Sequence, residues 1–223
     1  RFINPKMKDL YGVDGMGETA ENLADRDGIS REDQDKFALW SQQKATAAQA
    51  KGRFAKEIVA VEIPQRKGDP KIFDTDEFMR PDTSLEGLSK LKGAFKKDGG
   101  TVTAGNASGL NDGAAAIILM SGEKMKALGL KPLAKITSYA DAAHDPKYFT
   151  TAPSLALPKA LKKANLSSAD IDFFEFNEAF SVVGIVNTKL LKLDASKVNT
   201  RGGAVSLGHP LGCSGARIIV TLT

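Results

Sequence analysis

The first fifty residues carry apolar side chains at the spacing of two helices. Residues 18–24 predict a short helix, and Ser30 with Asp33 forms a capping box that opens a longer one. Phe37 and Trp40 recur at helical spacing in that second helix. We therefore expect Trp40 to pack in the core rather than to contact a ligand.

Alternating and fully apolar segments further along the chain predict strands. Residues 56–64 alternate around Glu57 and Glu62, and residues 113–120 form an apolar run typical of a strand buried on both faces. Because strands and helices alternate in the second half, we expect parallel pairing and a layered α/β fold. Further strands are predicted at 101–103, 132–139, 171–175 and Val198, and further helices at 84–92, 121–128, 154–164, 179–191 and from 214 onward.

The composition is that of a globular protein of one or two domains. The 223 residues are 42% hydrophobic and 26% charged, which is enough apolar material for a core. The net charge of +4 is spread along the chain, so it argues only weakly for nucleic acid and equally fits a cleft for a polyphosphate ligand. The composition changes near residues 110–125, where we place a domain boundary.

Cysteine usage and the chain ends bear on location and completeness. Cys213 is the single cysteine, which excludes an internal disulfide framework, argues against a bound metal and suits a reducing compartment. No apolar run reaches the roughly 20 residues that span a bilayer. We expect a cytoplasmic protein, with an organellar targeting sequence ahead of Arg1 as the alternative. The chain starts on Arg1 without an initiator Met and stops at Thr223 within apolar sequence, from which we expect a fragment of a longer protein.

A glycine-rich turn at residues 201–217 holds the most candidate chemistry. It places His209 among five glycines, and Pro210 biases His209 toward an extended backbone. A rigidly held imidazole suits a proton donor or acceptor, or a hydrogen-bond donor to a developing oxyanion. The alternative is a glycine-rich turn in which the histidine is incidental. His144, the only other histidine, has the surroundings of a polar loop residue.

Two further segments carry polar groups suited to a ligand. Asn177 stands where a strand gives way to a helix, so its amide is either a helix N-cap or a neutral donor that orients a water at a carbonyl oxygen. We expect Glu178 to meet the helix dipole or hold a turn, and Cys213 to pack rather than act as a nucleophile. Residues 104–113 let an elongated ligand approach the backbone, but they match neither a dinucleotide fingerprint nor a P-loop.

Three segments taken together resemble the thiolase family. They are residues 102–116, the Asn-Glu-Ala-Phe motif at 177–180 and the glycine-rich stretch at 202–217, which occur in the family's order and spacing. Residues 16–22 also resemble the start of the family's loop domain, so the resemblance runs through the whole chain. It implies an incomplete αβαβα layered α/β fold, with a loop domain at 1–110, the last strand and helix of the N-terminal domain at 111–130, and a truncated C-terminal domain at 131–223.

The resemblance implies an acyl-CoA C-acyltransferase that condenses two acetyl-CoA to acetoacetyl-CoA, or cleaves 3-oxoacyl-CoA with CoA, through an acyl-cysteine. His209 matches the histidine that activates the cysteine, and Asn177 matches the asparagine that holds the oxyanion-hole water. Coenzyme A is then a substrate, no cofactor or metal is expected, and the complete protein is expected to be a homodimer or homotetramer. Arg80, Phe95, Ala104, Ser108 and Leu110 match the CoA channel, Met16, Ala179 and Phe180 the pantetheine end, and Phe149 the acyl pocket.

Departures from the family pattern leave the activity and the substrate open. Both active-site cysteines of the family would lie outside the printed sequence, and Cys213 matches neither, so we expect no turnover by the chain as given. The first hundred residues resemble 3-oxoadipyl-CoA thiolases, whereas residues 148–153 and 174–183 resemble acetoacetyl-CoA thiolases, and Phe149 favours the shorter acyl group. An inactive thiolase-like partner and a CoA-binding module are the other interpretations.

Overall fold

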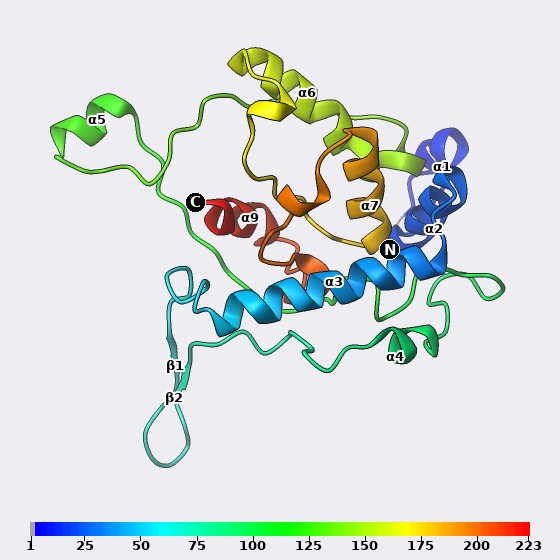
Figure 1. Cartoon of the computed structure of the whole chain (residues 1–223), viewed down its shortest axis with the longest axis horizontal. Coiled ribbons are helices and arrows are strands. Elements are labelled where there is room, and N and C mark those ends of the chain that lie inside the picture. The colour runs from blue at the N-terminus through cyan, green and yellow to red at the C-terminus, as the bar shows by residue number, and fades with distance from the viewer. Residues whose placement is uncertain (1–2) are drawn as a thin grey trace.

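A computed structural model describes residues 3–223, and the long helix α3 (Arg31–Ala50) crosses the molecule (Figure 1). The helix begins as expected. The Ser30 hydroxyl accepts from the Asp33 backbone N–H, and the Asp33 carboxylate accepts from the Ser30 backbone N–H. Small side chains, Ala38 and Ala45 among them, form much of its buried face, which lets α7 (Ser181–Leu190) and α8 (Ala204–Leu207) approach closely.

The prediction that Trp40 packs in the core is wrong. It stays partly exposed on the flank of α3, edge-on to Phe37, with the Lys44 ammonium 3.6 Å from its ring centroid. An apolar residue at helical spacing is buried only if its side of the helix packs against another element. In α3 the side that meets α7 and α8 carries the smaller residues instead.

Most helices predicted from periodicity are present, with ends shifted by a few residues. Two short helices, α1 and α8, and the three 3₁₀ turns were not predicted. None of the helices formed by residues 3–223 is both long and apolar enough to cross a membrane. The remaining helices are α1 (Pro5–Tyr11), α2 (Met16–Asp27), α4 (Leu85–Ser89), α5 (Gly122–Ala127), α6 (Ala152–Ala164) and α9 (Ser214–Leu222), with 3₁₀ turns η1 (Pro146–Thr151), η2 (Ser168–Asp170) and η3 (Ala195–Lys197).

The regular strands of the described chain form one hairpin that projects from the body (Figure 1). β1 (Val61–Ile63) pairs with β2 (Lys71–Phe73) in antiparallel register, with Glu62 opposite Ile72. Gly68 in the connection has φ +85°, a conformation that glycine adopts without strain. Of the predicted strand at 56–64, only the second half therefore forms.

Of the parallel strand pairing expected in the second half, the described chain forms one isolated parallel bridge, between Phe174 and Val198. The Phe174 N–H donates to the Lys197 carbonyl, and the Asn199 N–H donates back to the Phe174 carbonyl. The two short strands predicted at 171–175 and Val198 thus lie side by side.

Three predicted strands are wrong for the described chain. Residues 113–120 and 132–139 run as extended, exposed chain on either side of α5, and Ile118 is 85% exposed. A strand needs a neighbour for its backbone hydrogen bonds, and nothing in residues 3–223 pairs with either segment. Val102 and Thr103 are buried, but the Glu21 carboxylate accepts hydrogen bonds from the N–H groups of Thr101 and Val102, which a neighbouring strand would otherwise take.

The core lies where α2, α3 and α7 meet. Leu23 and Ala24 of α2 pack with Val102 and with Val182 and Val186 of α7. Smaller clusters lie between α3 and α8, around Leu207, and under the Phe174–Val198 bridge. These clusters hold in place the residues before α7 and after α8, and those residues carry the candidate site.

Candidate active site

His209 follows α8 on a turn that is docked against residues 104–113. Gly208 has φ +89°, and a Cβ built there would lie 2.2 Å from Oδ1 of Asn111, so this position requires glycine for both conformation and space. The His209 backbone N–H donates to the Gly109 carbonyl at 2.9 Å. The structure therefore brings together two segments that the sequence singled out separately.

Hydrogen bonds to both ring nitrogens define the His209 tautomer. Nε2 lies 3.3 Å from Nδ2 of Asn177, which is a donor and so requires an unprotonated Nε2. Nδ1 then carries the proton and donates to Oγ of Ser214 at 2.6 Å, and that hydroxyl donates to the Pro210 carbonyl. Sequence reasoning missed Ser214. The pattern that could have found it is a serine five residues after the histidine, at the position where a helix was expected to start.

Burial lowers the pKa of His209 below its ordinary value, and the positive charge of Arg217 lowers it further. Arg217 lies on α9, one turn beyond Ser214. Both effects favour the neutral imidazole at physiological pH. The unprotonated Nε2 can then accept a proton once the long 3.3 Å contact with Asn177 gives way.

Asn177 is not a helix N-cap, which corrects one of its two expected roles. α7 begins at Ser181 with Phe180 in the cap position, because Phe180 forms an antiparallel bridge with Ala107 that keeps the backbone extended to that point. Oδ1 of Asn177 is buried, and no group within residues 3–223 hydrogen-bonds to it. This orphaned acceptor fits a water or ligand donor at the site.

Glu178 points into the core and holds the segment before His209. Its carboxylate accepts hydrogen bonds from the Ser41 hydroxyl at 2.7 Å, from Nδ2 of Asn199 at 2.7 Å and from the Val205 backbone N–H at 3.3 Å. The side chain is fully buried. The expectation that Glu178 holds a turn is confirmed, but it lies ahead of α7 and does not meet that helix's dipole.

Several residues matched to the CoA channel and pantetheine end lie together. The Ser108 hydroxyl donates to the Ala179 carbonyl at 2.8 Å, beside the Ala107–Phe180 bridge. The ring of Phe95 meets Phe180 edge-on, with centroids 6.1 Å apart. This group is continuous through the backbone with Asn177, which contacts His209, so five of the other candidate residues lie near the histidine.

The other candidate residues occupy different surroundings. Met16 and Phe149 line a cavity of about 500 Å³ together with His144 and Lys147. Arg80 is anchored to α3, where its backbone N–H donates to Oε1 of Gln42. The two other candidates, Ala104 and Leu110, are exposed at the ends of the turn that contacts His209. His144 is therefore more than a polar loop residue, because it lines a cavity and its Nε2 lies 2.7 Å from Oγ1 of Thr151.

Cys213 is buried next to the histidine turn, as expected of a packing residue. Among the described side chains, no three His, Cys, Asp or Glu groups gather in a way that would hold a metal ion. The chemistry that these residues offer is a neutral imidazole base, an amide donor and backbone groups for an elongated ligand.

Two family models match the chain, the thiolase N-terminal domain over residues 2–123 and the thiolase C-terminal domain over residues 130–223. The chain belongs to the thiolase family. It is similar to beta-ketoadipyl-CoA thiolase of Acinetobacter baylyi, with 55% identity over 99% of this chain and 55% of that protein. It is also 54% identical to acetyl-CoA acetyltransferase of Chromobacterium violaceum, over 99% of this chain and 56% of that protein.

Solved structures agree with the thiolase fold. The chain matches Bacillus anthracis acetyl-CoA acetyltransferase with a TM-score of 0.89 and 49% identity, over 93% of this chain and 52% of that one. It matches human mitochondrial 3-ketoacyl-CoA thiolase with a TM-score of 0.88 and 47% identity, over the same shares. The predicted family and α/β thiolase-like fold are confirmed. The chain spans about half the length of the relatives that it matches.

Proposed function

We propose that the complete protein carrying this chain is an acyl-CoA C-acyltransferase. It condenses two acetyl-CoA molecules to acetoacetyl-CoA, or cleaves a 3-oxoacyl-CoA with CoA. The observation that carries the proposal is the pair of Asn177 and an Nε2-unprotonated His209, held 3.3 Å apart in a member of the thiolase family. The sequences named above support this class of reaction without choosing between its substrates.

In the proposed reaction, His209 is the base. Its Nε2 takes the proton of a cysteine thiol, the thiolate attacks the thioester carbonyl, and the acyl group moves from CoA to the cysteine. The lowered pKa of His209 makes the imidazolium a ready donor, so the proton passes to the departing CoA thiolate. Asn177 holds the water that hydrogen-bonds to the developing oxyanion. The chain's only cysteine, Cys213, is buried, so the proposal assigns the reacting thiol to residues outside the printed sequence.

The test is cleavage of acetoacetyl-CoA by the complete protein with CoA present. We expect His209→Ala to lower kcat/KM by about 10²- to 10⁴-fold, the range of a lost general base. Lys67→Gln, at the tip of the β1–β2 hairpin, is the control and should keep the wild-type rate. A near-normal rate in His209→Ala would overturn the proposal for this residue. The 223-residue chain alone should show no turnover.

A second candidate substrate is 3-oxoadipyl-CoA, which carries a terminal carboxylate. The cavity lined by Phe149 also holds His144 and Lys147, two side chains able to meet such a carboxylate, although Asp14 lies on the same wall. The ratio of kcat/KM for 3-oxoadipyl-CoA and acetoacetyl-CoA decides between them. If the dicarboxylic substrate is the true one, Lys147→Met lowers that ratio. A ratio that favours acetoacetyl-CoA and does not change in the variant supports our first choice.

Assembly and location belong to the same proposal. We infer a homodimer or homotetramer for the complete protein, which light scattering on that protein would measure. We infer the cytoplasm as its location, supported by the single cysteine and by relatives from bacteria.

A further inference from the structure

Arg217 carries a buried positive charge close to the candidate site. Both Nη atoms of its guanidinium are buried, and neither donates a hydrogen bond to a group in the described part of the chain. Nη1 lies 3.8 Å from Oε2 of Glu175, which is an ion-pair distance but too long for a hydrogen bond. Asp76, ahead of α4, is the second acidic group on which this charge acts. A charge in the protein interior acts over longer distances than one that water and salt screen.

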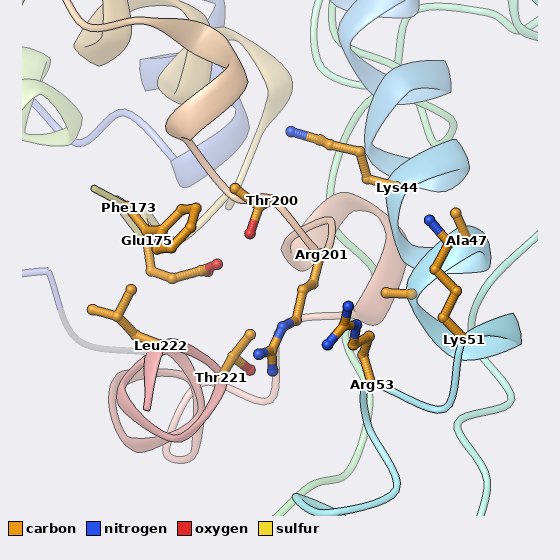
Figure 2. A pocket seen from close by; sticks show the side chains of 11 residues that line it. Lys44, Ala47, Lys51, Arg53, Phe173, Glu175, Thr200, Arg201, Thr221 and Leu222 are labelled. Atoms are coloured by element: carbon orange, nitrogen blue, oxygen red, sulfur yellow. The ribbon is translucent and has the colours of Figure 1, made fainter. Parts of the chain in front are cut away.

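The segment before α7 contacts both the histidine and the arginine. Glu175 and Asn177 are two residues apart and face the same side, because the residues that alternate with them pack in the hydrophobic cluster under the parallel bridge. Asn177 contacts Nε2 of His209, and Glu175 pairs with Arg217. Figure 2 shows Glu175 beside the last turn of α9. The Asn177–His209 contact and the Glu175–Arg217 pair therefore lie next to each other.

Helix α9 brings the guanidinium to the imidazole from the other side. Ser214, whose hydroxyl accepts a hydrogen bond from Nδ1 of His209, and Arg217 are three residues apart. They share one face of the helix and are about 4.5 Å apart along its axis. The two side chains that hydrogen-bond to the ring, those of Asn177 and Ser214, are uncharged. The charge that acts on the ring in addition to its burial is that of Arg217.

The counter-charge of Arg217 depends on pH. Burial raises the pKa of Glu175 to about 7 in spite of the opposing charge of Arg217. Glu178 raises the pKa of Glu175 as well, and Lys44 and Arg201 lower it. The carboxyl group therefore neutralises the guanidinium above about pH 7 and becomes neutral itself below that pH.

We propose that Arg217 is a positioning residue of the thiolase reaction, whose buried guanidinium keeps the imidazole of His209 uncharged and able to take the proton of the cysteine thiol. This inference rests on the proposed function of His209 as the base. Glu175 loses its negative charge in the pH range just above that in which the imidazole takes up a proton. The field of Arg217 is therefore strongest where it is needed to keep the base neutral.

Loss of the charge and loss of packing have different signatures. Arg217→Gln removes a positive charge, so the pKa values of His209 and of Glu175 should both rise. A variant that only lets water in would raise the pKa of His209 and lower that of Glu175, because burial acts on the two groups in opposite directions. NMR titration of the complete protein measures both, with the signals assigned by His209→Gln and Glu175→Gln. A fall for Glu175, or no rise for His209, would overturn the proposal.

Two control variants separate the charge from the side chain that carries it. Arg217→Lys keeps the positive charge and should keep the pKa of His209 below that in Arg217→Gln. Arg66→Gln removes the same charge from the β1–β2 connection and should leave both pKa values as in the wild type. If circular dichroism shows that Arg217→Gln does not fold, the double variant with Glu175→Gln replaces the ion pair by two amides and carries the same expectation for His209.

The acid limb of the pH–rate profile connects the charge to the reaction. If His209 is the base, kcat/KM for acetoacetyl-CoA cleavage falls as pH drops through its pKa, so Arg217→Gln should move this limb to higher pH. Below the limb we expect kcat/KM to be about threefold to tenfold lower than in the wild type, and the difference should narrow as pH rises. A loss of equal size at every pH would indicate a structural role and contradict the proposal.

The two measurements distinguish failure of this inference from failure of the proposed function. If the pKa of His209 rises in Arg217→Gln but the acid limb does not move, the effect of Arg217 on the imidazole stands and the role of His209 as the base is refuted. If the pKa of His209 does not respond while His209→Ala abolishes the activity, the base stands and the role of Arg217 is refuted.

Discussion

His209 is held by three contacts on three segments, and each contact sets a different property of the ring. The Gly109 carbonyl fixes the backbone, the Ser214 hydroxyl fixes which nitrogen carries the proton, and the Asn177 amide faces the nitrogen that remains free. Replacing Ser214 by alanine would leave the position and burial of the His209 ring unchanged. The proton could then sit on either ring nitrogen. The imidazole is therefore held in one position and one tautomer by contacts within the chain.

The lowered pKa of His209 predicts a loss of stability on the acid side. The unfolded chain binds the proton near pH 6.5 and the folded chain binds it only at lower pH, so the free energy of unfolding falls as pH drops below about 6.5. The fall ends once pH is below the folded pKa. NMR titration of the ring gives the folded pKa, and urea unfolding at several pH values gives the stability.

His209→Gln is the comparison for that measurement, because it cannot take up the proton. It should show a smaller decrease of stability between about pH 6.5 and pH 5 than the wild type. A folded pKa at or above 6.5 would contradict the prediction.

At the scale of elements, the residue that precedes α8 packs closely on Glu178. A Cβ built at Gly203 would lie 2.3 Å from the carboxyl carbon of Glu178, whose oxygens are already bonded to Ser41 and Asn199. The carboxylate cannot move without giving up these bonds. Glycine is required here for space, shortly before the turn that carries His209.

Gly203→Ala should therefore destabilise the chain by about 1–3 kcal/mol, the usual cost of overpacking a core. Gly215→Ala is the matched control, because a Cβ there meets nothing within 4 Å and alanine favours the α9 helix. Urea unfolding of both variants measures the difference. Equal stability of the two would show that the segment at 203–207 shifts more easily than its contacts imply.

The helices and the histidine turn could be predicted because their signals are local. The capping box at Ser30 and the glycines around His209 specify conformation from neighbouring residues alone. The strands at 113–120 and 132–139 could not, because an apolar run becomes a strand only if another strand lies beside it. The partners of Glu178 were missed for a similar reason. Ser41 and Asn199 come from segments far from it in the sequence, and no local pattern records them.

At the scale of the whole molecule, apolar side chains remain on the surface around α5. Ile118 is 85% exposed and Leu119 is 71% exposed, on the long excursion that carries α5 away from the body (Figure 1). Contiguous apolar surface of this kind favours association with other apolar surfaces.

The 223-residue chain should accordingly self-associate, and Ile118→Lys with Leu119→Lys should reduce this without lowering stability, because neither side chain is buried. Light scattering at increasing protein concentration measures the association. Val182→Lys is the contrasting variant, since Val182 is fully buried and its replacement should unfold the chain. A chain that stays monomeric at high concentration would contradict this expectation.

One face of the helix α9 connects the surroundings of His209 with those of Glu57. Ser214, Arg217 and Thr221 recur at three- and four-residue spacing, so they share one face. The first contacts the imidazole, the second acts on the charge of both His209 and Glu175, and the third donates to Glu57, the ion-pair partner of Arg201. Arg217 therefore acts on two titratable groups, the imidazole of His209 and the carboxyl group of Glu175. By thermodynamic reciprocity, whatever effect protonation of Glu175 has on the proton affinity of His209, protonation of His209 must have on the proton affinity of Glu175.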